Sequence, residues 1–470
     1  MRLCGNAVRI PMETAPVRPR RPPLKPITRE LWSLAAPIIG LNVLNVLSLA
    51  VDTALCGRLP NQDVVLAALG YSVQLLFLLQ VAMFGLTIGS VAMVARAHGA
   101  RDRARVDLVL GQSITLTVLV SVGVAVLGNL FASPIVHALG ADDAVTAEAL
   151  RFLRPLLTGT VFSYLILLFA ALLRGVGNTR LPFQVALLQN ALNALFNSVL
   201  IYGALGIPAL GVAGAAWGTL ASQAIGVIVL VSRLKAGAVP GIALPRRLPP
   251  IVRAEVAALW RVGAPAALDM VILNASFISL IAMLGYIDDA AVAAHGIGLR
   301  IQALAFVPGM SIAQATGALV GQSLGAGNPE RAREVFRASV RLCVGVMGSL
   351  SFIILVLAPW LVQVFDVHPD SRVGAHAVMW MRILGFGMPI VSVWIATSGL
   401  LQGAGDTQTS LRINVIATIF VQIPLSWLLG FPLGLGAAGV WLGMPLAAIA
   451  RTWQGIAAYR QNRWVTKGKR

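Results

Sequence analysis

The sequence predicts an all-α polytopic membrane protein of twelve transmembrane helices, arranged as two six-helix lobes about a pseudo-two-fold axis along the membrane normal. The chain of 470 residues is 57% apolar and only 11% charged, whereas a soluble domain is about half apolar and roughly a quarter charged. Apolar stretches of spanning length follow one another, and the two halves of the chain share motifs in one register. These observations exclude a soluble enzyme and a disordered chain.

Each apolar stretch holds the roughly 20 residues that a helix needs to cross a bilayer. Lipid cannot satisfy exposed backbone polar groups, and the alternation typical of a β-barrel is missing from the sequence, so each stretch is expected to be a helix. The predicted spans are 31–57, 66–95, 108–131, 149–173, 181–204, 210–232, 256–285, 291–320, 339–365, 377–401, 410–430 and 436–457.

The regions outside the spans are basic. Residues 1–28 combine prolines and arginines without an apolar core, which predicts a disordered cytoplasmic arm rather than a signal peptide. The first lobe is expected at 29–232 and the second at 256–457. A cytoplasmic linker rich in proline and arginine, 233–255, joins them, and a basic cytoplasmic tail, 458–470, follows.

Most of the 36 lysines and arginines lie in the two tails and in every second connection. Basic flanks remain in the cytoplasm, so both termini are predicted to be cytoplasmic in a plasma (inner) membrane protein. The net charge of +18 therefore reports topology, and no nucleic-acid partner is expected. Three isolated cysteines make neither a disulfide framework nor a metal site.

The two halves of the chain repeat each other at an offset of 228 residues. Six helices in each unit return the second unit to the membrane in the same orientation, with a cavity between the units. Parallel repeats of this kind are typical of transporters; the alternative is a scaffold of two packed bundles that does not transport. The matching segments are 31–37 with 259–265, 99–105 with 327–333, and 172–179 with 400–407.

Buried acids inside a membrane are default candidates for function, and only Asp52 and Asp269 lie well inside predicted spans. Polar stripes in lipid must face protein or water, so the stripes of the first and fifth spans are expected to face each other around Asp52. The alternative is that the asparagines only hold helices together. These stripes comprise Asn42, Asn45 and Ser48 in the first span and Asn190, Asn193 and Asn197 in the fifth.

The same positions in the second half are mostly apolar, which places the ionisable site in the first lobe. Desolvation favours the neutral acid, whereas water or a nearby cation favours the ionised form. A proton and a cationic substrate can therefore compete for the state of Asp52, which is the coupling that antiport requires. Adding 228 takes the polar residues of the first lobe to Met270, Leu273, Leu280, Thr418, Val421 and Leu425.

Asp269 and Arg300 both lie near the middle of the membrane by helix rise, and we expect them to pair because each alone is costly. The alternative role for them is substrate or proton binding. Pro37 and Pro265 occupy equivalent places in the first and seventh spans and predict kinks. The first kink either responds to protonation of Asp52 or is static.

The chain resembles the multidrug and toxic compound extrusion (MATE) transporters over about residues 29–455, and within them the DinF-like branch. The resemblance implies two six-helix lobes and cation-coupled export of organic, often cationic compounds. It is carried by Leu31-Trp32-x4-Pro37, Val51-Asp52-Thr53, Gly175-x-Gly177-Asn178-Thr179, Leu210-Gly211-Val212-x-Gly214, Ala293-Ala294-His295, Gly321-Gln322-x2-Gly325-Ala326-Gly327 and Gly403-x-Gly405-Asp406-Thr407.

In the DinF-like branch, the resemblance implies a proton site at Asp52, surrounded by residues that match Asn45, Asn193 and Thr219. This chain has Asn197 where that branch often has a second aspartate, which removes one titratable group. Other branches place acids in the seventh and tenth spans. The matching residues here are Asn274 and Ile390, so no sodium site is expected in the second lobe.

We therefore expect a secondary active antiporter that exports organic compounds and is coupled to protons through Asp52. Its expected partners are a small organic substrate, a coupling cation and the bilayer, and it is expected to be monomeric, without a cofactor or bound metal. The alternatives are a sodium-coupled exporter and a flippase for a lipid-linked precursor, whose relatives usually carry fourteen spans and a cationic cavity. A receptor or scaffold that does not transport ranks third. A membrane enzyme ranks last, because the spans hold no nucleophile–base pair or metal cluster.

Overall fold

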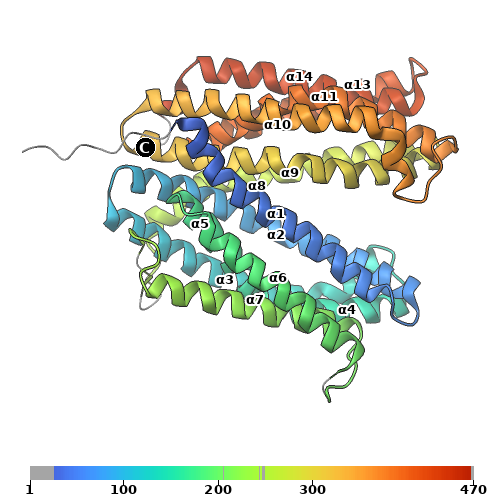
Figure 1. The fold of residues 1–470 in the computed structure, drawn as a ribbon, viewed down its shortest axis with the longest axis horizontal. Coiled ribbons are helices and arrows are strands. Elements are labelled where there is room, and N and C mark those ends of the chain that lie inside the picture. The colour runs from blue at the N-terminus through green and yellow to red at the C-terminus, as the bar shows by residue number, and fades with distance from the viewer. Residues whose placement is uncertain (1–25, 205, 243, 246–248, 467–470) are drawn as a thin grey trace, which may run out of the picture.

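The computed structural model describes residues 26–204, 206–242, 244–245 and 249–466, and among them there are helices and turns but no strand (Figure 1). The helices of the first half are α1 (Ile27–Cys56), α2 (Gln62–Gly99), α3 (Arg103–Ala138), α4 (Asp143–Thr158), α5 (Thr160–Gly175), α6 (Arg180–Tyr202) and α7 (Val212–Lys235). Those of the second half are α8 (Arg253–Gly285), α9 (Asp289–Gly325), α10 (Pro329–Gln363), α11 (Arg372–Gly403), α12 (Thr407–Val415), the π-helix η1 (Ile416–Gln422), α13 (Ile423–Gly430), α14 (Gly436–Arg460) and the 3₁₀ turn η2 (Arg463–Val465).

The expected twelve-helix architecture is confirmed. One span is bent between α4 and α5, and another consists of α12, η1 and α13. Ten helical stretches of the described residues are long and apolar enough to cross a membrane, and one of them is α12–η1–α13. α4 and α5 meet at an angle of 56° and together form a further span. α14 has 25 residues and makes the twelfth crossing, although Arg451 in its middle lowers its apolarity.

α1 and α8 each cross from one lobe to the other. Leu31 and Ile38 of α1 are buried in a core built mainly from α9, α10 and α11 of the second lobe. In the equivalent position 228 residues later, Leu259 of α8 is buried in the core of α2, α3, α5 and α7 of the first lobe. The first half of each crossing helix is thus anchored in the opposite lobe, which the motif repeat alone does not indicate.

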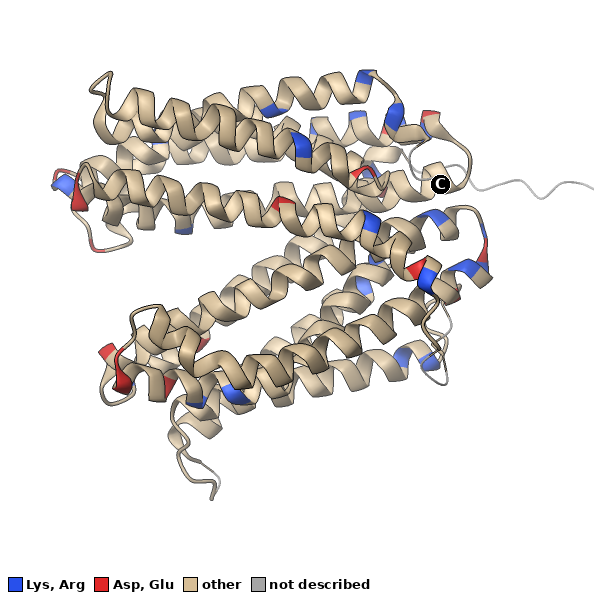
Figure 2. Cartoon of the chain, turned by 180° about the vertical axis from the view of Figure 1, so that it is seen from behind, with Lys and Arg blue, Asp and Glu red and all other residues tan. Residues whose placement is uncertain are grey.

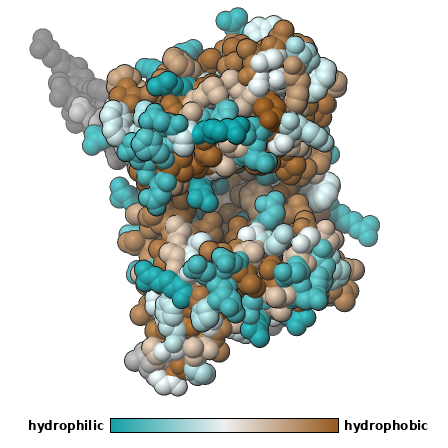
Figure 3. Space-filling view, turned by 90° about the vertical axis from the view of Figure 1, so that its right-hand side faces the viewer, coloured by the Kyte–Doolittle hydropathy of each residue, from teal (hydrophilic) through white to brown (hydrophobic). Residues whose placement is uncertain are grey.

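Lys and Arg gather at one end of the bundle, where the chain's C-terminus lies (Figure 2). We call this the basic end and its opposite the far end. Near the basic end, the hydrogen bonds that join the lobes include Arg174 Nη1 to Gln314 Oε1 at 2.7 Å and Gln322 Nε2 to the carbonyl of Gly175 at 2.8 Å. At the far end the surface is hollowed between the lobes (Figure 3). The lobes therefore meet at the basic end and part at the far end.

The glycine-rich elements at the ends of α5 and α11 form tight turns at the basic end. Gly177 and Gly405 adopt φ angles of +87° and +74°, which disfavour residues with a side chain. The turns leave carbonyls at the helix ends free for the opposite lobe, and Arg96 Nη2 donates to the carbonyl of Ala404 at 3.0 Å. These turns therefore contribute to the contact between the lobes.

The predicted terminal segments meet different outcomes. The arm at 1–28 lies outside the described residues except for its last three, and α1 already begins at Ile27. Residues 458–460 of the predicted tail continue α14. Beyond them Trp464 is fully buried and stacks on Tyr459, with ring centroids 6.0 Å apart. The described part of the tail is therefore packed against the second lobe.

Candidate functional site

Asp52 lies in the last turn and a half of α1, facing α6. Asn197 Nδ2 donates a hydrogen bond to Asp52 Oδ1 at 2.6 Å, and Asn197 is fully buried. One turn earlier, Ser48 Oγ donates to Asn193 Oδ1 at 3.2 Å. The structure therefore brings the polar residues of the two helices face to face.

The third wall of this site is α7. Asn193 Nδ2 donates to Thr219 Oγ1 at 2.9 Å, so the amide connects α1, α6 and α7. Gly218 makes the close approach possible, because a Cβ there would lie 2.1 Å from Asn197 Oδ1. Gly214 and Gly218 are four residues apart, the small-residue spacing at which membrane helices approach closely. Gly218 has no polar side chain and belongs to no polar stripe, so this spacing is the signal in the sequence that points to it. We call Ser48, Asp52, Asn193, Asn197 and Thr219 the first-lobe centre.

Three of the stripe residues lie outside the first-lobe centre. Asn45 is exposed. Asn190 Nδ2 donates to the carbonyl of Ala186 on its own helix at 2.7 Å, and its Oδ1 has no partner in the described part of the chain. Asn42 Nδ2 donates to Ser311 Oγ of α9 at 3.0 Å. The expected stripe of α1 is therefore divided: Asn42 joins the two lobes, and only its far part faces α6.

The second lobe holds a polar centre of its own. Asp269 of α8 is 5% exposed and accepts hydrogen bonds from Asn414 Nδ2 at 2.5 Å and Ser410 Oγ at 3.1 Å. Arg451 Nη2 of α14 donates to Thr418 Oγ1 at 2.8 Å and Gln422 Oε1 at 3.0 Å. Gln422 Nε2 in turn donates to Ser276 Oγ at 2.6 Å. We call these seven residues the second-lobe centre.

The expected pair of Asp269 and Arg300 is wrong. Arg300 is exposed, and its guanidinium lies 6.0 Å from the ring centre of Phe365, whereas Asp269 is buried among α8, α12 and α14. The positive charge that acts on Asp269 is that of Arg451. Arg451 lies inside the predicted span 436–457, so its position was visible in the sequence. The half-buried Arg451 of α14, and not Arg300, therefore supplies the positive charge near Asp269.

The π-helix η1 explains why a fixed offset missed one member of the second-lobe centre, Gln422. Asp52 pairs with a residue 145 positions later, and Asp269 likewise with Asn414, before η1. After η1 the separation is 146, between Ser276 and Gln422. A π-turn inserts one residue into a helix, so Gln422, not Val421, is the counterpart of Asn193. The expectation that the second lobe lacks such a site is therefore wrong.

The two kink prolines lie in the halves of α1 and α8 that are anchored in the opposite lobe. α1 runs unbroken through Pro37 and α8 through Pro265. Each proline removes one helical hydrogen bond at its position. They precede the polar centres along the same helices, with Pro37 before Asp52 and Pro265 before Asp269. A static and a moving kink both fit this arrangement.

The polar centres are built from single carboxylates and amides. In the part of the chain that the structure describes, no three His, Cys, Asp or Glu side chains come together as a metal site would require. A lone carboxylate held by an amide N–H can exchange one proton. It can also attract one organic cation from a neighbouring hollow.

Comparison with known proteins places this geometry in context. The MatE family model matches residues 37–199 and 265–428. The chain is 27% identical over 447 residues to the "Probable multidrug resistance protein YoeA" of Bacillus subtilis, covering 94% of this chain and 95% of that protein. It is also 27% identical over 446 residues to the "Probable multidrug resistance protein NorM" of Thermotoga maritima, covering 93% of each chain.

Solved structures share the fold. One described as the "Outward-facing conformation of a multidrug resistance MATE family transporter of the MOP superfamily" superposes with a TM-score of 0.86 at 22% identity, covering 95% of this chain and 97% of that one. Another, "Crystal structure of MATE in the bent conformation", has the same TM-score, identity and coverage.

Proposed function

Because the chain belongs to the MatE family, we propose that it is a proton-coupled antiporter that exports organic, often cationic compounds across the plasma membrane. The observation that carries the coupling role is the hydrogen bond of 2.6 Å between Asp52 and the fully buried Asn197. The basic end is cytoplasmic by the distribution of Lys and Arg. The protein works as a monomer, with both termini in the cytoplasm.

The path from proton to conformation runs along α1. Its first half is held in the second lobe by Leu31 and Ile38, and its last part is held in the first lobe through Asp52 and Asn197. A proton on Asp52 removes the charge that the amide N–H stabilises, so the bond to α6 weakens. The two ends of α1 are tied to different lobes, so a change at Asp52 alters how the lobes pack together. Protonation thereby biases the equilibrium between the two access states.

The hollow at the far end is the substrate's exit. With the basic end in the cytoplasm, lobes that meet there and part at the far end correspond to the state open to the outside (Figure 3). An exported cation leaves from this state, and protons enter the first-lobe centre from the same side. The proton thus replaces the positive charge of the substrate, and each favours a different state.

The test is substrate efflux from proteoliposomes driven by an imposed pH gradient, with a fluorescent organic cation as the probe. We expect Asp52→Asn to reduce proton-driven efflux at least about tenfold and to remove its dependence on pH. The matched control is Arg300→Gln, an exposed residue outside both polar centres, which should retain wild-type efflux. Unchanged coupling in a folded Asp52→Asn variant would overturn the assignment of Asp52.

Sodium is the competing coupling ion, and the same vesicles distinguish it. Imposing a sodium gradient at equal pH on both sides should drive no efflux. A carboxylate with amide neighbours provides few oxygens for a metal cation, because Asp52 is the only acid of the first-lobe centre. Efflux driven by sodium but not by protons would replace the proton in this proposal and leave the export function intact.

A further inference from the structure

Two grooves flank α10 on the surface of the second lobe, away from both polar centres. One, of about 590 Å³, lies between α10 and α11 near the far end. The other, of about 580 Å³, lies between α9 and α10 nearer the basic end. Large exposed side chains on this side, among them Phe352 and Phe386 at 69% and 73% exposure, show that it faces the acyl chains of the bilayer.

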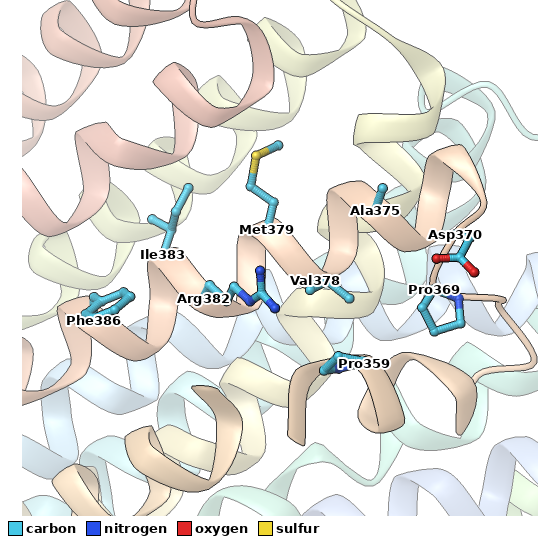
Figure 4. Close-up of a pocket in the computed structure, with 9 residues that line it drawn as sticks. All are labelled: Pro359, Pro369, Asp370, Ala375, Val378, Met379, Arg382, Ile383 and Phe386. Carbon is cyan, nitrogen blue, oxygen red and sulfur yellow. The ribbon is translucent and has the colours of Figure 1, made fainter. Parts of the chain in front are cut away.

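Each groove contains one exposed arginine, which lies within the first turns of a predicted membrane span. In the far groove, Arg382 lies among Val378, Met379, Ile383 and Phe386 of α11 (Figure 4). Its guanidinium has no hydrogen-bond or ion-pair partner among the residues that the structure describes. Arg382 follows the start of α11 by ten residues, about 15 Å of helix. A guanidinium on a lipid-facing surface near a span end reaches toward the membrane interface, where a phosphate is its natural counter-charge.

The groove nearer the basic end also holds an exposed arginine, Arg341, whose Nε donates to the carbonyl of Arg337 at 3.3 Å. Arg341 lies twelve residues into α10, about 18 Å of helix. Gly345 and Ser349 follow on the same side of the helix and leave a shallow channel, which Pro308 of α9 borders. A Cβ at Gly345 would meet nothing within 4 Å, so the channel is open there.

The direction of both helices favours contact with lipid headgroups. A side chain on a helix leans toward the N-terminus. α10 begins at the basic end and α11 at the far end, so Arg341 leans toward one membrane surface and Arg382 toward the other. Each guanidinium therefore points from its groove to the nearer layer of lipid phosphates. The apolar lining of each groove continues along the helices away from the arginine.

We propose that each groove binds one glycerophospholipid, with its phosphate on Arg382 or Arg341 and an acyl chain in the apolar channel. Guanidinium binds phosphate through paired N–H donors, which matches the chemistry of a phosphodiester. Asp370 lines the rim of the far groove, so an anionic headgroup binds less tightly there than at Arg341. The two sites hold α9, α10 and α11 at opposite membrane surfaces, independently of transport.

The test is native mass spectrometry of the purified full chain titrated with phosphatidylglycerol. We expect Arg341→Gln and Arg382→Gln each to weaken one lipid-binding step about fivefold, and the double variant to weaken two. Gly345→Leu, which fills the channel and keeps the charge, should weaken only the step lost in Arg341→Gln. The control is Arg300→Gln, an exposed arginine of the same lobe that lines neither groove and should bind as the wild type.

Two results would overturn the proposal. One is a double variant that binds phosphatidylglycerol with the wild-type number and affinity. The other is an equal loss in Arg300→Gln, which would show that any exposed positive charge suffices. Inorganic phosphate at equal concentration should not displace the lipid, because it does not occupy the channel; displacement would refute the role assigned to the acyl chain.

Discussion

At the scale of single residues, each lobe holds one carboxylate within a membrane helix, and the two lobes stabilise it in different ways. Asp52 has amide and hydroxyl neighbours, so the first-lobe centre contains no fixed positive charge. Asp269 accepts hydrogen bonds from two side chains, and the guanidinium of Arg451 on α14 adds a positive charge near it. A permanent cation favours the ionised carboxylate. This difference supports the proposed proton exchange at Asp52 and predicts a stabilising role for Asp269.

The stabilising role predicts that Asp269 and Arg451 depend on each other. Asp269→Asn and Arg451→Gln should each reduce the free energy of unfolding by about 2–3 kcal/mol, because each leaves the other charge without its opposite in a site where Asp269 is buried and Arg451 is half-buried. The double variant should lose less than the sum of the two. A double-mutant cycle measured by denaturation in detergent should give a coupling of at least about 1 kcal/mol.

The control cycle pairs Asp269→Asn with Arg300→Gln. Arg300 is exposed and contacts only the ring of Phe365, so its loss should add independently to that of Asp269. Coupling in this cycle, and additivity in the cycle with Arg451, would reverse the assignment of the partner.

A second residue-scale prediction concerns Asp288, which precedes α9 at the far end. The backbone N–H of Ala290, followed by Arg372 and His376, lowers the pKa of Asp288 below its ordinary value of 3.8. A lowered pKa stabilises the fold above the ordinary value, and the contribution disappears as the pH falls through the lowered value. Asp288→Asn should therefore lower the melting temperature at pH 7, and this difference from the wild type should disappear as the pH falls through the lowered pKa. A difference that persists unchanged as the pH falls below 3.8 and through the acid range would contradict the electrostatic origin.

At the scale of elements, the sequence predicts the helical spans and the faces that carry their polar residues. It does not predict which helices those residues contact or how far they are buried. Helical periodicity puts Ser48, Asp52 and Asn197 on the correct faces, because it depends only on residue spacing. It cannot show that Asn45 is exposed, or that Asn42 contacts the other lobe, because these depend on tertiary packing. The added residue in η1 has no signature in composition, so a fixed repeat offset missed Gln422.

The π-helix makes a prediction about deletions. Removing Ile419 from η1 should convert the segment to an α-helix and keep the residues of α13 on their present face, so the variant should fold. Removing Leu195 from the regular α6 should rotate all later residues by about 100° and separate Asn197 from Asp52. Both deleted side chains are lipid-exposed, at 43% and 56%, which makes Leu195 a matched control.

Size-exclusion chromatography of the two variants measures this difference. The Ile419 deletion should give a monodisperse peak, and the Leu195 deletion should aggregate. Equal aggregation of both would show that η1 is not a simple insertion into a regular helix.

At the scale of the whole molecule, closure at the basic end depends on backbone contact between α2 and α9. A Cβ at Gly325 would lie 1.9 Å from the carbonyl oxygen of Arg96, and one at Gly99 would lie 2.0 Å from that of Gln322. The motif repeat matches Gly99 with Gly327, but only the arrangement of the lobes shows that the ends of α2 and α9 touch each other. The glycines therefore permit the state in which the far end is open.

Gly325→Leu should shift the protein away from that state. Overpacking against a backbone that cannot move costs about 1–3 kcal/mol, which changes a two-state population roughly tenfold. The lobes should then separate at the basic end and approach each other at the far end.

Spin labels at Arg58 and Tyr286, in a background without native cysteines, report the distance between the lobes at the far end, which should shorten in Gly325→Leu. Gly348→Leu is the control, because a Cβ there meets nothing within 4 Å and should leave the distance unchanged. A larger side chain at a contact that limits closure must move the lobes apart. If Gly325→Leu folds and keeps the wild-type distance between the spin labels, closure at the basic end does not depend on the crossing of α2 and α9.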